Sequence, residues 1–396
     1  TEITQNILND LERVIQNQNE ENVLLQVDYL VPVGENIQYE AGYRGNYRNI
    51  FNDFYFEERL VFPNGPLVPD TGLINAFGYK ELVNAAYFQY GQKFNKISIL
   101  GGLRYEHTAL EIDQLTSLSE NKKSYGNFFP TLNIGYELKN GESFTLGYNK
   151  RIRRPRGRSL NPFPSRSSAT NIYRGNVDLN PVFTDAFDLG FLKRWEKFTL
   201  STSTYYNISK DNWETILQIT DKFTPNGGDA IFERFPVNLS TSERVGFEFT
   251  MSYKPFKFWN INSDFNVFHI TTDGDYTNPV TNLTTNFDFK NTSYFVRLNQ
   301  KLSLPRKTDI QINSNYSGPS QNAQSNNKGI LSMDFAASKE ILKEKATINF
   351  NISDVFNSRK RQSTLFIENI SNQYSEFQWR ERQISVSFIY RFNQTK

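Results

Sequence analysis

The sequence of 396 residues contains no cysteine, only 2 histidines and only 2 methionines. Without cysteine, the chain can form neither a disulfide framework nor a thiolate metal site. No stretch approaches the ~18 consecutive apolar residues that a transmembrane helix requires. These absences exclude a disulfide scaffold, a thiolate metal domain and a helical membrane protein.

An excess of charge of either sign is also lacking. Lys plus Arg total 44 and Asp plus Glu total 42, which gives a net charge of +2. Proteins that follow a phosphate backbone need a clustered basic surface rather than a balanced one. The charge balance therefore argues against nucleic acid as a partner.

Aromatic residues are abundant although apolar residues overall are not. The 34 Phe, 21 Tyr and 4 Trp make up 15% of the chain, whereas all hydrophobic types together reach 38%. A soluble domain of this size would bury its aromatics in a core of Leu, Ile and Val, and would show helices with a 3.6-residue apolar period. Almost no such period occurs here.

The dominant pattern is instead an apolar period of two. Ile348, Phe350 and Ile352 alternate with Asn349 and Asn351. The same alternation recurs at 25–31, 37–48, 97–106, 132–136, 144–148, 245–253, 294–299 and 384–392. Because successive side chains of a strand point to opposite faces, each segment has one apolar and one wet face.

Short and long joints alternate between these segments. The short ones lie near 33–36, 94–96, 139–142, 194–197, 254–257, 304–307 and 343–346. The long, polar ones lie roughly at 48–80, 109–124, 152–183, 209–243, 272–287, 318–327 and 357–381. This rhythm predicts hairpins with tight turns at one end of a sheet and long loops at the other.

The strand lengths indicate a membrane. We count about 14 to 16 strands of about 9 to 14 residues, longer than the ~5 to 6 of soluble sheets and suited to a tilted bilayer crossing. Inside lipid every backbone amide must be paired, so such a sheet has to close on itself. The prediction is an all-β, transmembrane antiparallel β-barrel over residues 22–396, with apolar side chains toward lipid and polar ones toward a wet lumen.

Two alternatives stay open at this point. Residues 1–21 are either the end of an earlier strand with an extracellular loop or a short helix. A soluble antiparallel sandwich also alternates in polarity, but many strands here end in Tyr, Phe or Trp, as interfacial girdles do.

The segment 149–191 resembles the barrel of TonB-dependent outer-membrane receptors of the Bacteroidetes type. Its matching positions are Arg154, Pro155, Leu160, Asn161, Pro162, Phe163, Gly175, Asn176, Leu179, Pro181, Leu189, Gly190 and Phe191. Val177 and Val182 depart from the pattern, which often has Pro and an acidic residue there. The segments 351–358 and 385–393 are also similar to this family.

The resemblance implies a bacterial outer-membrane protein that takes up a large or scarce solute with energy from the inner membrane. Barrels of this kind have about 22 strands and follow a plug domain, for which we find no pattern before residue 22. We therefore expect this chain to be the C-terminal part of a larger receptor. The implied partners are outer-membrane lipid and lipopolysaccharide, a TonB-type energy-transducing complex through the missing N-terminal part, and a surface lipoprotein or other chain.

Two other functions are weighed against this one. A passive porin of ~16 strands that closes without a plug fits the same strand count. An enzyme barrel would need clustered Asp/His or Ser/His residues near one rim, yet His107 and His269 are far apart on apolar faces. With no Gly-rich phosphate loop and no nucleophile elbow either, we expect no enzyme and no cofactor.

Five arginines are the candidate ligand-binding residues: Arg151, Arg153, Arg154, Arg156 and Arg158. They stand at the mouth of the strand that begins near residue 143. A ring of fixed positive charge with low-dielectric walls can draw an anionic ligand into the lumen. The alternative is that they pair with acidic loop residues or with lipopolysaccharide.

A weak metal candidate lies in 271–278, where Asp273 and Asp275 offer oxygen ligands for calcium. Their spacing does not match the twelve-residue calcium loop, and Asp-Gly is commonly only a turn. Apart from these two residues, the sequence predicts no metal site.

Overall fold

The computed structural model describes residues 12–59, 65–168, 170–223, 228–239, 241–277, 282, 284–367 and 371–392. Strands make up about three quarters of this part of the chain. Its helical segments are the 3-10 turn η1 (Lys139–Gly141) and the one-turn helix α2 (Gly157–Leu160). Neither of these two segments is long and apolar enough to cross a membrane.

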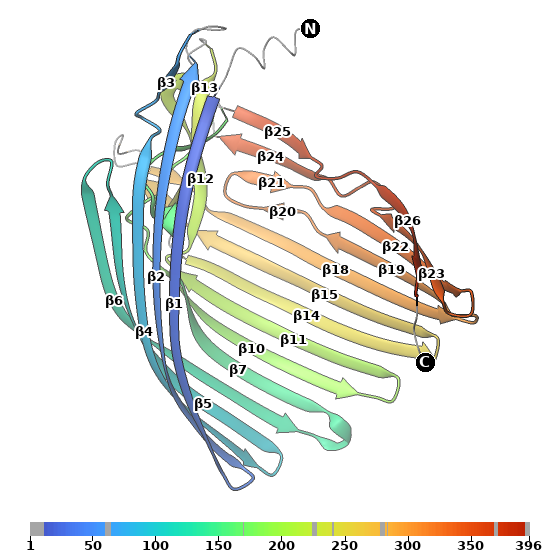
Figure 1. Cartoon of the computed structure of the whole chain (residues 1–396). Coiled ribbons are helices and arrows are strands. Elements are labelled where there is room, and N and C mark those ends of the chain that lie inside the picture. Colours follow the sequence, from blue (N-terminus) through green and yellow to red (C-terminus); the bar gives the residue numbers. More distant parts are fainter. Residues whose placement is uncertain are drawn as a thin grey trace.

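One large antiparallel sheet of 16 strands forms the body of the molecule (Figure 1). Its strands are β1 (Glu12–Val33), β2 (Ile37–Arg59), β3 (Leu67–Pro69), β4 (Asn75–Phe94), β5 (Ile97–Gln114), β6 (Ser119–Glu137), β7 (Ser143–Arg153), β10 (Val182–Arg194), β11 (Phe198–Lys210), β14 (Thr241–Phe256), β15 (Trp259–Asp273), β18 (Phe289–Leu304), β19 (Thr308–Ser317), β22 (Ile330–Ile341), β23 (Ala346–Ser353) and β26 (Gln383–Tyr390). They follow one another in chain order, with β3 paired beside β2 and with β1 and β26 at the two edges. The sheet is strongly curved, and its strand number and meander order confirm the prediction.

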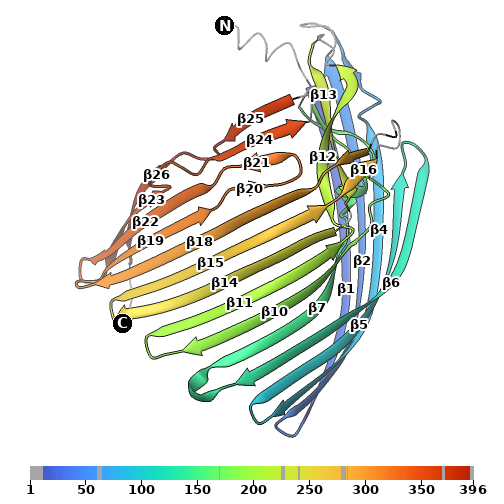
Figure 2. The same cartoon turned by 180° about the vertical axis from the view of Figure 1, so that it is seen from behind.

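Smaller sheets fill the long joints. The first loop sheet joins β12 (Trp213–Phe223), β13 (Ala230–Asn238), β9 (Asn171–Tyr173) and β8 (Ser165–Ser168), in that order. The second loop sheet joins β20 (Ser320–Gln321), β21 (Ser325–Asn327), β24 (Arg361–Ile367) and β25 (Ser371–Phe377), while β16 (Asp275–Thr277) pairs with β17 (Thr284–Asn286). Figures 1 and 2 show these elements at the end of the sheet opposite the tight hairpin turns.

Two of the predicted long joints are shorter than expected. β5 and β6 run on until only residues 115–118 connect them, and β2 and β4 extend into the predicted joint 48–80. Residues 12–21, placed before the first strand from the sequence, are the first half of β1. In the extensions of β4 and β5 the polarity of the two faces is reversed. Leu110 and Ile112 are buried on the face that carries Arg104 and Glu106, while Lys80 pairs with Glu111 at 2.8 Å on the opposite face.

The two faces of the sheet differ as predicted. In the strand register Phe247 lies between Thr204 of β11 and Val267 of β15, while Glu248 lies between Ser203 and Asn266. Phe247 is 41% exposed and Ile348 is 39% exposed, so neither lies in a dry core. The apolar row therefore faces outward, and the polar row lies on the opposite face.

Loop residues show which face is the lumen. Leu160 and Leu179 pack against a buried cluster that includes Leu110 and Ile112 of β5. By the period of two, Leu110 and Ile112 share their face with Arg104 and Glu106. The polar face of the sheet is therefore the one that the joint between β7 and β10 folds onto.

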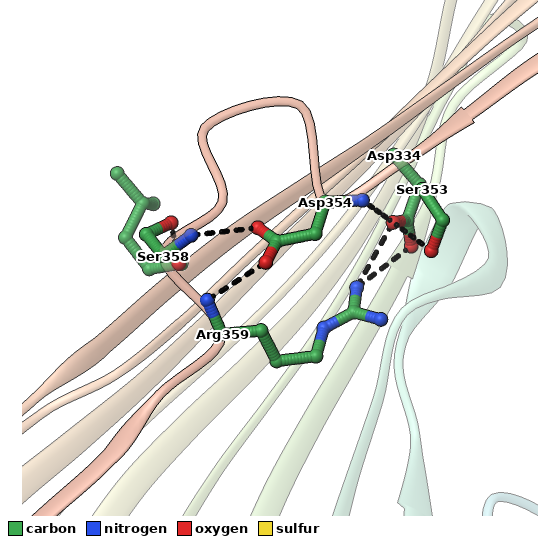
Figure 3. A network of polar contacts seen from close by, with 6 residues as sticks. Asp334, Ser353, Asp354, Ser358 and Arg359 are labelled. Atoms are coloured by element: carbon green, nitrogen blue, oxygen red, sulfur yellow. Dashed lines mark hydrogen bonds and ion pairs between the residues drawn. The ribbon is translucent and has the colours of Figure 1, made fainter. Parts of the chain in front are cut away.

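A turn stabilised by Asp354 ends β23 (Figure 3). Asp354 has a φ of 53°, is 2% exposed, and accepts backbone N–H groups of Ser358 at 3.1 Å and Arg359 at 2.9 Å. Asp334 of β22 accepts the N–H of Asp354 at 2.8 Å and the Arg359 guanidinium at 2.9 and 3.0 Å. The resemblance segment 351–358 thus forms a hydrogen-bonded corner that directs the chain into β24.

Because the apolar row faces outward, a charge inserted on that face should cost more stability than the same charge inserted on the polar face. Phe247→Arg should destabilise the protein in a bilayer by about 2–4 kcal/mol, because it places a cation in lipid. Ser203→Arg, at the same depth on the other face and next to Glu248, should leave stability nearly unchanged. Unfolding in urea from lipid vesicles measures both, and equal losses in the two variants would contradict the sidedness.

The Asp354 turn gives a second prediction. Asp354→Ala removes the acceptor of two part-buried N–H groups, those of Ser358 and Arg359, and should lower the free energy of unfolding by about 1–2 kcal/mol. Asp354→Asn keeps an acceptor and tolerates the positive φ, so it should lose clearly less. Limited proteolysis within 357–381 reports the effect locally, and a cleavage rate unchanged by Asp354→Ala would show that the turn does not depend on this carboxylate.

Candidate functional site

The five predicted arginines lie close in sequence but have different surroundings. Arg154 donates to Glu106 at 2.6 Å and to Thr108 at 2.9 Å. Glu106, whose side chain is 12% exposed, also accepts from Arg104 at 2.6 Å. Arg154 is therefore a structural anchor that ties the joint after β7 to the lumen face of β5.

Arg153 anchors the first loop sheet. Its guanidinium stacks on the Trp213 ring at 4.0 Å and donates to Asn212 at 3.0 Å. Burial raises the pKa of the neighbouring Glu214 carboxyl, while Asn212 and Arg153 act in the opposite direction. Arg153 therefore connects the end of β7 to the beginning of β12.

Arg151 lines a separate hollow of mixed charge. It donates to Asn149 on its own strand. The hollow, of about 420 Å³, is also lined by Arg44, Arg104 and two carboxylates, Glu40 and Glu106. With acidic and basic groups together, this part of the lumen has no clear preference for one sign of ligand charge.

Arg156 and Arg158 belong to a different environment, a pocket of about 540 Å³ that we call the arginine pocket. Its walls come from β1, β2 and β4, from α2, and from the segment 161–165 with β9. Arg48 of β2 is a third arginine in its lining, and no lining residue is acidic. Glu20, which is not part of the lining, forms an ion pair with Arg48 at 2.7 Å.

Two observations indicate that the arginine pocket has unused hydrogen-bonding capacity. Asn75, at 3% exposure, lines it with a side-chain oxygen that has no hydrogen-bond partner among the described residues. Buried polar atoms are normally paired, so an orphaned one needs an explanation. The guanidinium of Arg156 likewise makes no hydrogen bond or ion pair with the described part of the chain, and that of Arg158 lies 4.9 Å from the Tyr173 ring centroid.

The resemblance motif builds the floor of this pocket. Asn161 accepts from Gln114 at 2.6 Å and from the N–H of Phe163 at 3.1 Å. The N–H of Gly175 donates to the carbonyl of Asn161 at 2.7 Å, and a Cβ at Gly175 would lie 2.5 Å from that carbonyl oxygen. Only glycine permits this approach, which explains its place in the motif.

The two aspartates of the weak calcium prediction, Asp273 and Asp275, belong to neighbouring elements. Asp275 accepts from Asn286 at 2.9 Å in the β16–β17 hairpin, while Asp273 ends β15. Within the described ranges the one compact acidic group is Glu111, Asp113 and Glu120, and Lys80 and Lys122 already neutralise it. A calcium site at Asp273 and Asp275 stays an untested prediction.

Sequence reasoning missed Arg48, Asn75 and Glu106. Arg48 and Glu106 stand on the polar register of their strands, so the alternation gave a detectable signal of lumen exposure. Asn75 has no such signal, because its burial depends on a joint that begins about eighty residues later in the chain. Contacts between distant segments cannot be read from periodicity.

The curved antiparallel sheet, with an apolar outer face and loops folded onto a polar inner face, defines an outer-membrane β-barrel protein. The sequence matches the outer membrane protein beta-barrel family over residues 1–390, and the chain belongs to that family. This membership places it in the bacterial outer membrane. No curated protein matches the sequence.

Solved structures share the fold at low sequence identity. The ferric yersiniabactin uptake receptor FyuA from Yersinia pestis has 12% identity and a TM-score of 0.63, covering 95% of this chain and 55% of its own. The siderophore receptor PiuA from Acinetobacter baumannii has 12% identity and a TM-score of 0.63, with 95% of this chain and 56% of PiuA covered. The ferric citrate transporter FecA has 11% identity and a TM-score of 0.61, with 96% of this chain and 55% of FecA covered. The chain thus spans about half the length of these proteins.

The anchoring role of Arg154 yields a prediction that separates it from its neighbours. Arg154→Gln leaves Glu106 with one cationic partner fewer in a largely buried place, and should lower the free energy of unfolding by about 1–3 kcal/mol. Arg156→Gln removes no contact with the described protein and should change stability little. Thermal melts of the two variants compare them directly, and similar melting temperatures would show that Arg154 is not an anchor.

Proposed function

We propose that this chain is most of the barrel of a TonB-dependent receptor that takes up an anionic solute too large or too scarce for passive diffusion. The observation that carries the proposal is the arginine pocket, which lines the lumen at the loop end and contains no acidic residue. Guanidinium groups hold carboxylates and similar anions by paired hydrogen bonds. A solute arriving from outside would meet this pocket first.

The comparisons support a transport role. The similar structures include receptors for ferric chelates and a ferric citrate transporter. In this proposal the plug and the segment that engages a TonB-type complex lie in the part of the receptor outside this chain. Lipopolysaccharide contacts the outer rim, and a surface lipoprotein or other chain can cover the loops.

The other functions have weaker support. A passive porin has no observation of its own in its favour. For an enzyme, His107 and His269 lie on the outer face of β5 and β15, where they meet Ser124 at 3.1 Å and Thr292 at 2.8 Å. Neither lines the lumen, so we propose that the protein has no catalytic activity.

The proposal predicts a charge-dependent loss of binding. The double change Arg156→Gln with Arg158→Gln should weaken binding of ferric citrate, a compact anionic chelate, at least about ten-fold, since each lost charged hydrogen bond is worth about 1.5–3 kcal/mol. Arg380→Gln, an exposed arginine outside the pocket, is the matched control. Equilibrium binding to outer-membrane vesicles at low and high salt measures the difference.

Uptake by whole cells separates the receptor from the porin. Energised uptake should stop when a protonophore collapses the proton gradient, whereas porin flux should continue. An unchanged affinity in the double variant would reject the arginine pocket as the capture site, and protonophore-resistant uptake would reject energised transport.

A further inference from the structure

A third cavity, of about 610 Å³, lies between the two loop sheets. We call it the inter-sheet cavity. On the first loop sheet its lining includes Leu217 of β12 and Arg234 of β13, which are paired across the strands. On the second loop sheet it includes Arg361 and Phe377, which are paired between β24 and β25. Each wall is thus one face of a small sheet.

The alternation of side chains confirms that each wall is a single face. Ser363 pairs with Ser375, and both stand two residues from the Arg361–Phe377 pair, so all four share a face. On the first loop sheet, Thr215 and Leu217 are likewise two residues apart on β12. The opposite face carries Ile216 and Phe235, which are buried in a hydrophobic cluster. The sheet therefore has a dry back and a front that faces the cavity.

The arginine pocket opens on the same front face. Tyr173 lines the arginine pocket and Asn171 lines the inter-sheet cavity. They are two residues apart on β9, about 7 Å along one face of the strand. Arg234, in the lining of the inter-sheet cavity, pairs directly with Tyr173. The two cavities are therefore neighbouring parts of one trough along the front of the first loop sheet.

The walls of the trough are held in place before any ligand binds. β12 is an edge strand, and the side-chain amide of Gln324 pairs with its backbone: the N–H of Leu217 donates to Gln324 at 2.7 Å, and Gln324 donates to the Leu217 carbonyl at 3.0 Å. Ala323 packs on the hydrophobic cluster behind the sheet. This contact joins the two loop sheets, and a preformed site loses less entropy when it binds.

The trough carries arginines along its length. Arg48, Arg156 and Arg158 line one end, Arg234 stands beside Tyr173 where the two cavities meet, and Arg361 lines the other end. Neither lining contains Asp or Glu, and within the described chain the guanidinium groups of Arg234 and Arg361 make no hydrogen bond or ion pair. The two linings also contain uncharged polar side chains, among them Ser165, Ser363, Gln373 and Ser375.

We propose that this trough is an extended binding site for an elongated solute that carries carboxylates at separated positions and hydroxyl groups between them, the chemistry of an acidic oligosaccharide. The proposal rests on the proposed uptake function and names the class of its substrate. Guanidinium groups along the trough hold carboxylates, and the amides and hydroxyls of the two linings match sugar hydroxyls. A cation would find no acidic partner in either lining.

Binding of galacturonate oligomers to the full-length protein in detergent micelles tests the proposal by calorimetry. A ligand that reaches both ends gains from effective concentration, so hexagalacturonate should bind at least ten-fold more tightly than galacturonic acid. Arg361→Gln should weaken hexagalacturonate about ten-fold and leave galacturonic acid unchanged. Arg361→Lys keeps the positive charge but loses the paired donors of the guanidinium, so its affinity for hexagalacturonate should lie between those of Arg361→Gln and the wild type. Arg380→Gln should bind hexagalacturonate as tightly as the wild type.

The outcomes separate this proposal from the uptake function. If hexagalacturonate binding depends on Arg156 and Arg158 but not on Arg361 or Arg234, the extended trough is wrong and the arginine pocket stands. If ferric citrate binds through Arg156 while no galacturonate binds, the substrate class is wrong. If no arginine change in either cavity alters binding of any anion, both proposals fail together.

Discussion

The structure depends on one constraint: a backbone that crosses lipid must pair all its amides within the sheet. Antiparallel neighbours in chain order meet this need with tight turns, and the pairing registers run without interruption along most of the large sheet. With the backbone amides paired in this way, alternate side chains of each strand face lipid and the lumen. Apolar residues are suited to the first environment and polar residues to the second, which produces the period of two.

The edges of the sheet are where this constraint is still visible. Among the described residues, β1 and β26 each have a neighbour on one side only, and the side chains of β26 are exposed along its whole length. Unpaired strand edges in a bilayer are costly, and they template further pairing. In the proposed receptor, further strands would join at these edges. This agrees with a chain that spans about half the length of its structural relatives.

The sequence predicted those features that depend on local alternation. The rows around Phe247 and Ile348, the hairpin rhythm and the joint between β7 and β10 all follow from side chains a few residues apart. Features that depend on distant segments were not predictable. Arg154 meets Glu106 across 48 residues and Gln324 meets Leu217 across 107, and no periodicity records such pairs. The sequence therefore predicted one ring of five arginines, whereas the structure gives these arginines different partners and surroundings.

The separate surroundings of these arginines also bear on the proposed preference of the arginine pocket for anions. Five guanidinium groups within eight residues repel one another, and like charges placed close together are destabilising. Glu106 offsets Arg154, and Arg153 lowers its cost by stacking on Trp213. Arg156 and Arg158 receive no such compensation from an acidic group in the pocket lining. A bound anion would supply it, and because such a ligand binds only the folded joint, binding and the stability of this joint must increase together.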